Sequence, residues 1–296
     1  MTTPTTRAHP PGTHTHVLER PSEAEKHNVA LIAARAFTTH PTYLWFAGVN
    51  RPGFAPPSPT AKSSKDIPQP ARSLYFFFRA LINAVFFSGG RIVVVRVPDS
   101  APLSASSSPH PLTSSNSPGR IVAIAIWLAP GFGESLDSPL NIYRLGFHRP
   151  VLGRGSWGLG AVKRLNATRA EYERLHETGV QKRGIKGGLH ACWTCELLGT
   201  EPDEEGKGYA SLLMREGLVY LDSLPTPPPC ILEANSPRLK AIYERFGFEG
   251  TAEVRAGTGK VDGDGFRVAR GGSPSDALGV YTVPMVVLTL LSGSRA

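Results

Sequence analysis

The turn Glu205-Gly206-Lys207-Gly208 has the residue types and the position of a phosphate-binding loop. It follows an apolar run at residues 197–199 and directly precedes a helical pattern. At such a junction the first N–H groups of the helix have no partner within the helix, and the helix dipole adds partial positive charge, so a pyrophosphate can bind there. The two glycines omit the Cβ atoms that would hold a phosphate away from the backbone. A purely structural turn before the helix is the alternative interpretation.

Two common phosphate-binding motifs do not fit this turn. It lacks the Gly-Lys-Ser/Thr of a Walker A loop, and the third glycine of the dinucleotide fingerprint is missing. The pattern Glu205-Gly206-Lys207-Gly208-Tyr209-Ala210 instead resembles motif A of the GNAT superfamily of acetyl-CoA-dependent N-acetyltransferases.

A second segment resembles motif B of the same superfamily. Leu232-Glu233-Ala234-Asn235 is followed, at the spacing the family requires, by Tyr243-Glu244-Arg245-Phe246-Gly247-Phe248. Three shorter segments resemble the N-terminal half of GNAT proteins common in fungi: residues 33–41, 89–91 and 127–131. The resemblance covers residues 17–291 and is specific from residue 190 to residue 250.

The resemblance implies transfer of an acetyl group from acetyl-CoA to a primary amine, by direct attack in a ternary complex. The acceptor would be a small-molecule or peptide amine. In the family, strand residues bind the pantetheine arm through their backbone, turn amides hold the pyrophosphate, and an asparagine contacts the cofactor. The matching positions here are Leu198, Gly199 and Thr200 for the arm, Glu205, Gly206, Lys207, Gly208, Tyr209, Ala210 and Ser211 for the pyrophosphate, and Asn235.

Glu205 departs from the arginine or glutamine that the family usually has at this position. A carboxylate beside a pyrophosphate is repulsive, so either the side chain turns away or binding is weakened, with Lys207 left as the local cation. Glu205 therefore motivates an alternative function, a catalytically degenerate GNAT-fold module that binds CoA or a protein partner without turnover.

Four residues are candidates for proton transfer. Tyr243 matches the family tyrosine that protonates the departing thiolate, and a phenol of pKa near 10 is a plausible donor to a thiolate. It also falls on an apolar stripe, so a core tyrosine is the alternative. Glu196 and Glu233 are candidate general bases for the amine, although a surface or salt-bridged carboxylate is the commoner fate, and His190 is a weaker candidate.

The cysteines allow a metal site to be drawn from Cys192, Cys195, Cys230 and His190. A spacing of three along a strand directs the first two thiols to opposite faces, so we expect no metal. Three cysteines cannot all pair, and residues 1–16 contain no apolar leader segment. These features favour a cytoplasmic or nuclear location.

The elements that must position these residues are read from hydrophobic periodicity. Ser22 and Glu25 form a capping box for a helix, and Ser236 with Pro237 begins another. The expected helices span residues 22–37, 74–87, 210–221 and 236–246, and the expected strands span residues 91–97, 120–128, 189–198, 230–234 and 280–291. This order predicts an α/β (α+β) fold, a single GNAT domain with a mixed, mostly antiparallel sheet flanked by helices.

Composition supports one domain with loops. The 296 residues include 31 glycines and 27 prolines, and much of this excess is clustered. We expect a flexible tail at residues 1–16 and a domain at residues 17–292, with disordered insertions near residues 51–70, 98–119 and 257–279. No apolar run is long enough to predict a membrane helix.

The formal net charge is +8, and residues 141–188 supply most of it, with ten basic and three acidic side chains. A basic face can attract nucleic acid, anionic lipid or a phosphorylated cofactor. A solvated helix surface is the more common explanation of such a run. We therefore do not expect nucleic acid as the partner.

Overall fold

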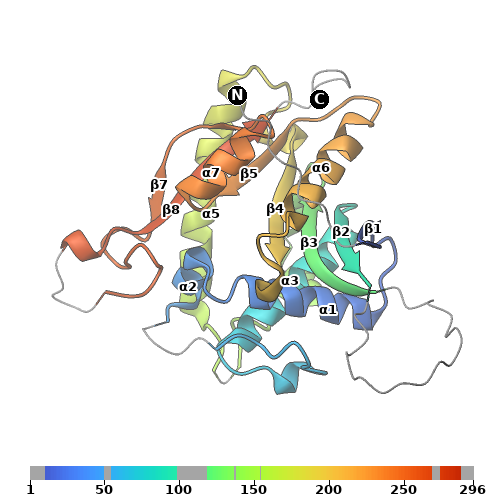
Figure 1. Ribbon diagram of the computed structural model, residues 1–296. Coiled ribbons are helices and arrows are strands. Elements are labelled where there is room, and N and C mark those ends of the chain that lie inside the picture. Colours follow the sequence, from blue (N-terminus) through green and yellow to red (C-terminus); the bar gives the residue numbers. More distant parts are fainter. Residues whose placement is uncertain are drawn as a thin grey trace, which may run out of the picture.

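One mixed sheet runs through the part of the chain that the structure describes. The computed structural model describes residues 11–49, 55–98, 119–136, 138–153, 155–268 and 274–287 (Figure 1). In chain order the strands are β1 (His14–Val17), β2 (Arg91–Val97), β3 (Arg120–Leu128), β4 (Trp193–Thr200), β5 (Cys230–Ala234), β6 (Glu249–Gly250), β7 (Val254–Ala256) and β8 (Val280–Val287). Their order across the sheet is β1-β2-β3-β4-β5-β8-β6, and β7 also pairs with β8.

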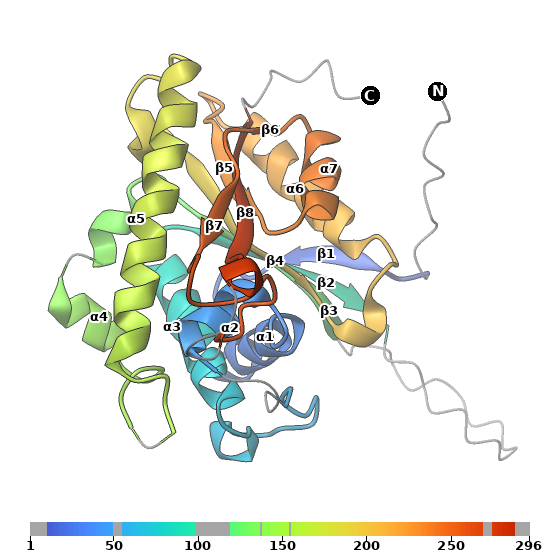
Figure 2. The same cartoon turned by 90° about the vertical axis from the view of Figure 1, so that its left-hand side faces the viewer.

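Helices cover both faces of this sheet (Figure 2). They are α1 (Glu23–Ala36), α2 (Pro41–Ala47), α3 (Ala71–Phe87), α4 (Pro139–Leu145), α5 (Leu159–Lys182), α6 (Tyr209–Asp222) and α7 (Pro237–Glu244). One core joins α1, α2 and α3 to Ile92, Ile124 and Leu197 of the strands. A second core joins α6 and α7 to the opposite face, where Trp127 is fully buried. Figure 2 shows α5 on the other side of the sheet from α6 and α7.

The only parallel pair among the strands described is β4 with β5, and it is short. It contains two residue pairs, Trp193 with Cys230 and Thr194 with Ile231. Two residues beyond Thr194, β4 carries a bulge at Glu196, because Ile126 and Trp127 of β3 pair with Leu197 and Cys195 respectively. A bulge bends its strand and increases the local twist. The bulge thus lies where the pairing of β4 with β5 has ended, and the rest of β4 is not paired with β5.

Strand β8 contains a proline in its middle, and the outermost strand is interrupted beside it. Pro284 pairs with Glu233 of β5 on one side. On the other side, β6 ends at Gly250 and β7 begins at Val254. Thr251 bridges this break by donating from its backbone N–H (2.9 Å) and its hydroxyl (3.1 Å) to the carbonyl oxygen of Pro284. The outer edge of the sheet is thus made of two short pieces.

Most of the expected elements are confirmed within a few residues. The capping box of Ser22 and Glu25 is present at α1, and Ser236 caps α7 by accepting a hydrogen bond from the N–H of Leu239. Gly217, on the apolar stripe of α6, packs so closely that a Cβ there would lie 2.0 Å from the ring of Trp127. The mixed, mostly antiparallel sheet in a single domain is also confirmed.

Some boundaries differ from the predictions. The strand expected from residue 189 begins at Trp193, because Gly188–Ala191 form a 3₁₀ turn that follows Gly187, which has a positive φ. Residues 14–16 of the predicted tail belong to β1, which pairs with β2. Ile67 and Val261, from two of the predicted insertions, are fully buried in the core. The predicted insertion at residues 98–119 lies almost entirely outside the described residues, as do residues 1–10 and 50–54.

Helix α5 lies within the basic stretch and carries local ion pairs such as Arg169 with Glu173 (2.6 Å) and Arg174 with Glu171 (2.8 Å). None of the helices in the described ranges is long and apolar enough to cross a membrane.

Candidate functional site

The turn between β4 and α6 has the backbone geometry of an anion-binding loop. Gly206 and Gly208 have φ of +76° and +86°, in the left-handed region that favours glycine. Gly208 precedes the first turn of α6, and no side chain caps this helix. A Cβ at Gly206 would meet no atom within 4 Å. An anion can therefore approach the start of α6, where the helix dipole favours negative charge.

Ion pairs fix the shape of this turn. Glu204 is buried and accepts a hydrogen bond from Lys207 Nζ (2.6 Å), and it is also paired with Arg120 of β3. Glu201 pairs with Arg35 of α1 at 2.7 Å. The Lys207 ammonium is thus paired with Glu204 and is not the free cation that was expected beside an anion. The Glu205 side chain is exposed.

The C-terminal part of β4, next to the turn, is paired on one side within the described residues. Leu198, Gly199 and Thr200 pair with β3, and no pairing with β5 extends to them. Their backbone is the position expected for a pantetheine arm. Asn235 follows β5 across the separation, and its side-chain oxygen accepts a hydrogen bond from the Thr282 hydroxyl at 3.1 Å.

Glu196 and Glu233 lie on the neighbouring strands β4 and β5, and the charge of Glu233 acts on Glu196. The bulge places Glu196 between Cys195, which packs in the α6 core, and Leu197, which packs in the α1 core. Burial raises the pKa of Glu196 from 4.5 to about 8, and the charge of Glu233 adds to this effect while Arg169 opposes it. Two neighbouring carboxylates resist being ionised together. Glu196 therefore keeps a proton at neutral pH and releases it in the range where a base is useful.

Helix α5 supplies polar partners to this pair. His176 Nε2 lies 2.7 Å from Glu233 Oε1, and the imidazole is 3% exposed. The hydroxyl of Tyr172 lies 2.7 Å from that of Thr282, which in turn bonds to Asn235. Burial raises the pKa of Tyr172 to about 12, so this phenol stays neutral. Tyr172 and His176 of α5 were not among the site residues predicted from the sequence.

A signal for this face of α5 does exist in the sequence. Thr168, Tyr172 and His176 recur at intervals of four residues, which places them on one side of a helix. Thr168 and His176 are buried in the structure. Tyr43 of α2 is also buried near the pair, and burial together with the charges of Glu196 and Glu233 raises its pKa.

Tyr243 lies on α7, on the opposite side of the sheet from α5. Its ring packs 6.1 Å from that of Phe248, and the side chain is 8% exposed. Burial raises the pKa of Tyr243, and charge at Cys195 and Glu233 raises it further, so the phenol keeps its proton at neutral pH. Tyr243 belongs to the same hydrophobic cluster as Cys195 of β4 and Leu232 of β5.

The other predicted polar residues are placed apart from this group. His190 is exposed in the 3₁₀ turn before β4. Cys192 packs in a small core with Val180 of α5, whereas Cys195 packs in the α6 core, as expected for thiols on opposite faces.

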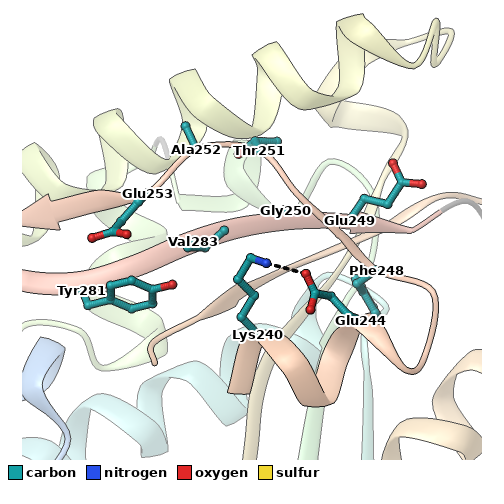
Figure 3. A pocket seen from close by; sticks show the side chains of 10 residues that line it. All are labelled: Lys240, Glu244, Phe248, Glu249, Gly250, Thr251, Ala252, Glu253, Tyr281 and Val283. Carbon is teal, nitrogen blue, oxygen red and sulfur yellow. Dashed lines mark hydrogen bonds and ion pairs between the residues drawn. The ribbon is translucent and has the colours of Figure 1, made fainter. Parts of the chain in front are cut away.

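A cavity of about 600 Å³ lies at the far edge of the sheet, between α7 and β8 (Figure 3). Figure 3 shows Lys240, Glu244, Tyr281 and Val283 around it, beside the break in the edge strand. Its carboxylates are paired, for example Glu253 with Arg255 at 2.8 Å. None of the residues predicted for catalysis or cofactor binding lines it.

Comparisons with known proteins bear on the fold. No protein-family model matches the chain, and no curated protein matches its sequence. Among solved structures, a putative arylalkylamine N-acetyltransferase 7 from the yellow fever mosquito matches with a TM-score of 0.52 and 10% identity, over 94% of this chain and 88% of that chain. Arylalkylamine N-acetyltransferase 2 from Aedes aegypti matches with a TM-score of 0.51 and 13% identity, over 94% of this chain and all of the other. The chain therefore has the GNAT fold.

Proposed function

We propose that this protein is an acetyl-CoA-dependent N-acetyltransferase that acts on a small primary amine. One observation carries the proposal: β4 and β5 separate after two paired residues. A turn suited to an anion lies at one end of β4. The two groups proposed for proton transfer are Glu196, at the bulge of β4, and Tyr243, which packs in one cluster with Cys195 of β4 and Leu232 of β5.

The residues at the turn fit the cofactor expected for this fold. The open space at Gly206 and the uncapped start of α6 suit a pyrophosphate. The backbone of residues 198–200 is not paired with β5 among the described residues, and it suits a pantetheine arm. Acetyl-CoA bound here supplies an activated acetyl thioester, and the positions that would hold it are those predicted from the sequence, with Asn235 on the opposite strand.

Glu196 is the better of the two candidate bases. An amine arrives mostly as an ammonium ion and must lose a proton before it can attack a thioester. In its ionised form, Glu196 accepts that proton at its carboxylate, and its pKa of about 8 brings it nearer to the pKa of an amine. Glu233 is engaged by His176, so in this proposal it acts on Glu196 rather than on the amine.

Tyr243 donates a proton to the departing sulfur. Its ring packs in one cluster with Cys195 of β4 and Leu232 of β5, and burial keeps the phenol protonated at neutral pH, so that it has a proton to donate. The ammonium nitrogen loses two protons in all. Glu196 takes the first before attack and later passes it to water. The second leaves the nitrogen after attack and, through solvent, replaces the proton that Tyr243 gives to sulfur.

The surroundings of Glu196 favour a small cationic acceptor. The carboxylates of Glu233 and of ionised Glu196 attract an ammonium ion. The ring of Tyr43, which is buried, and that of Tyr172, which is partly buried, are neutral and add apolar walls. The solved structures with the same fold include enzymes named for arylalkylamines. A small amine is therefore proposed ahead of a peptide.

The test combines binding and turnover. Calorimetry should detect acetyl-CoA binding, and thiol release should be measured over a panel of arylalkylamines, polyamines and lysine peptides. Tyr243→Phe should lower kcat by roughly 10- to 100-fold, because a general acid is lost. Tyr75→Phe is the matched control, since Tyr75 is also a buried tyrosine but lies on α3, bonded to His27. Absence of acetyl-CoA binding would overturn the proposal.

A second candidate, a module that binds CoA without turnover, is favoured by the exposed carboxylate of Glu205 at the turn. It predicts CoA binding with no thiol release from any amine of the panel.

A further inference from the structure

The large apolar side chains that remain exposed are concentrated in one short segment. Nine such side chains occur in the part of the chain that the structure describes, and six of them fall between residues 140 and 162. Single exposed apolar residues are normal on a protein surface, whereas a group of them marks a surface that contacts a partner. The six side chains are 37% to 71% exposed, and they are Leu140, Ile142, Tyr143, Leu152, Leu159 and Val162.

This segment is one folded unit at an edge of the molecule. Helix α4 is tied to α3, because Nδ2 of Asn83 donates to the carbonyl oxygen of Leu145 (3.2 Å). The loop after α4 folds back on itself, where the N–H of Trp157 donates to the carbonyl oxygen of Pro150 (3.0 Å), and α5 then begins. Figure 2 shows α4 and the start of α5 at one edge of the molecule, with α6 and α7 on the other side.

The same segment is basic and lacks counter-charges. Residues 139–170 include six basic side chains and no aspartate or glutamate. Arg144, Arg149 and Lys163 are exposed, and none of them is paired with a carboxylate in the described ranges. The second half of α5 differs, because its glutamates form ion pairs with arginines of the same helix. A solvated, ion-paired surface therefore explains only the later part of the basic stretch.

We propose that the six exposed apolar side chains and these three cations, termed the α4–α5 patch, dock the protein on the surface of a membrane that contains anionic phospholipid. At such a surface, aliphatic side chains enter the boundary of the acyl chains, and tyrosine is favoured at the level of the headgroups. Arginine and lysine extend their charged ends to the lipid phosphates. The docking goes beyond the proposed acetyl transfer and does not depend on it.

The mixture of side chains favours a lipid surface over two other occupants. Nucleic acid attracts cations, but proteins hold its single strands by stacking bases on aromatic rings, and Tyr143 is the only aromatic residue of the patch. A second copy of the chain in a two-fold contact would place the patch against itself. The unpaired cations of the two copies would then repel each other, whereas anionic headgroups attract them.

The experiment is sedimentation of the full-length protein with sucrose-loaded vesicles. We expect binding to vesicles of phosphatidylcholine with about 30% phosphatidylserine in about 0.1 M salt, and binding about tenfold weaker to phosphatidylcholine alone. Absence of binding to the phosphatidylserine vesicles would overturn the proposal. Light scattering is measured on the same samples without lipid, and self-association in place of vesicle binding would assign the patch to a second copy.

The cations are tested by removing two of them. Arg144→Gln combined with Arg149→Gln should weaken vesicle binding by about tenfold or more, because each cation close to an anionic membrane changes the binding constant by about fivefold. Lys182→Gln combined with Lys186→Gln removes two exposed cations from the later part of the basic stretch and is the matched control. Equal losses in the two double variants would show that only net charge matters, and would contradict docking through the patch.

The apolar side chains are tested separately. Tyr143→Ser, Leu152→Ser and Leu159→Ser together should weaken binding by about tenfold or more, because less apolar surface enters the membrane. Val219→Ser is the control, since Val219 is 67% exposed on α6, and urea unfolding checks that each variant is folded. Unchanged vesicle binding by the triple variant would overturn lipid docking, and retention of the wild type and the triple variant alike on DNA would assign the cations to nucleic acid.

A gain of signal covers the case in which the serine variants are unstable. Tyr143→Trp places a fluorescent ring in the patch, and Val219→Trp places one on α6, where no contact is expected. With brominated phosphatidylcholine in the phosphatidylserine vesicles, the additional fluorescence of Tyr143→Trp should be quenched and that of Val219→Trp should not. Equal quenching in both variants would contradict docking through the patch.

Discussion

Two glutamates, one within β4 and one in the turn just after it, have opposite electrostatic surroundings. Glu204, just after the strand, faces two cations, Lys207 and Arg120. Burial alone would raise its pKa, but hydrogen bonds and charge from Lys207 and Arg120 outweigh burial, and the pKa is lowered. Glu196, in the strand, faces another carboxylate, and its pKa rises to about 8.

The comparison distinguishes a structural carboxylate, Glu204, from a carboxyl group with the properties of a functional residue, Glu196. The carboxylate of Glu204 is fully matched and fixes the turn that precedes α6. Glu196 has Arg169 as a distant cation, and its protonation changes within the range of ordinary solution pH. Perturbed carboxyl groups of this kind are typical of functional sites.

The largest expected effect is on turnover. Glu196→Gln should lower kcat/KM by about 100-fold or more, because the general base is lost while the side chain keeps its size. The measurement is thiol release at pH 8 with the best amine of the panel. Glu171→Gln, an exposed ion-pair partner of Arg174 on α5, is the control and should leave the rate unchanged. A loss smaller than threefold for Glu196→Gln would remove Glu196 from the mechanism.

The pH dependence should follow the same residue. Because the pKa of Glu196 is about 8, the carboxyl is protonated and inactive below that value. The value of kcat/KM should rise by about tenfold per pH unit from pH 6 and level off above pH 8. A profile that is already flat at pH 6.5 would show that Glu196 is ionised in the free protein.

Stability should respond to pH in the opposite sense. The folded chain binds the Glu196 proton more tightly than the unfolded chain, so its stabilising effect is complete below pH 4.5 and is lost as pH rises to about 8. The slope of this contribution is at most about 1.4 kcal/mol per pH unit. Urea unfolding from pH 5 to pH 8 should show it as the difference between wild type and Glu196→Gln, and parallel curves would contradict it.

Glu204→Gln should act on the structure of the turn. We expect a loss of about 1 kcal/mol in the free energy of unfolding at pH 7, since its partners Lys207 and Arg120 are about half exposed and solvent weakens the pairs. The pKa of Glu204 is lowered, so its contribution is present above pH 4.5 and disappears in acid. Urea unfolding at pH 7 and pH 3.5 checks both statements, and an equal loss at the two pH values would contradict them.

The smallest effect concerns Glu205. Removing its exposed negative charge from the turn should tighten acetyl-CoA binding about twofold at low salt and less at 0.5 M salt, where charges are screened. Calorimetry on Glu205→Gln at both salt concentrations checks this. Weaker binding in the variant would mean that Glu205 helps to hold the cofactor.

What could be predicted from the sequence was local in origin. Ser22 and Ser236 allowed the starts of their helices to be predicted, because a helix cap involves only residues within one turn. The glycine turn before α6 was recognised for the same reason, although the pairing of Lys207 with Glu204, three residues away, was overlooked.

The rest depends on registers and contacts that the sequence does not display. The bulge at Glu196 exists only relative to β3, where Ile126 and Trp127 define it. His176 and Glu233 are separated by 57 residues in the chain, and no local pattern connects them. The two candidate bases could therefore be named from the sequence, but their different roles required the structure.

The interrupted outer strand has a consequence for how copies of this chain meet. A sheet edge with a long, regular row of unpaired N–H and C=O groups is a template for a strand from another molecule. Here the edge beside β8 consists of β6 and β7 with Thr251 turned back onto Pro284 between them. Neither piece exceeds three residues, so an incoming strand finds no continuous ladder to extend. The break protects this side of the molecule from edge-to-edge aggregation.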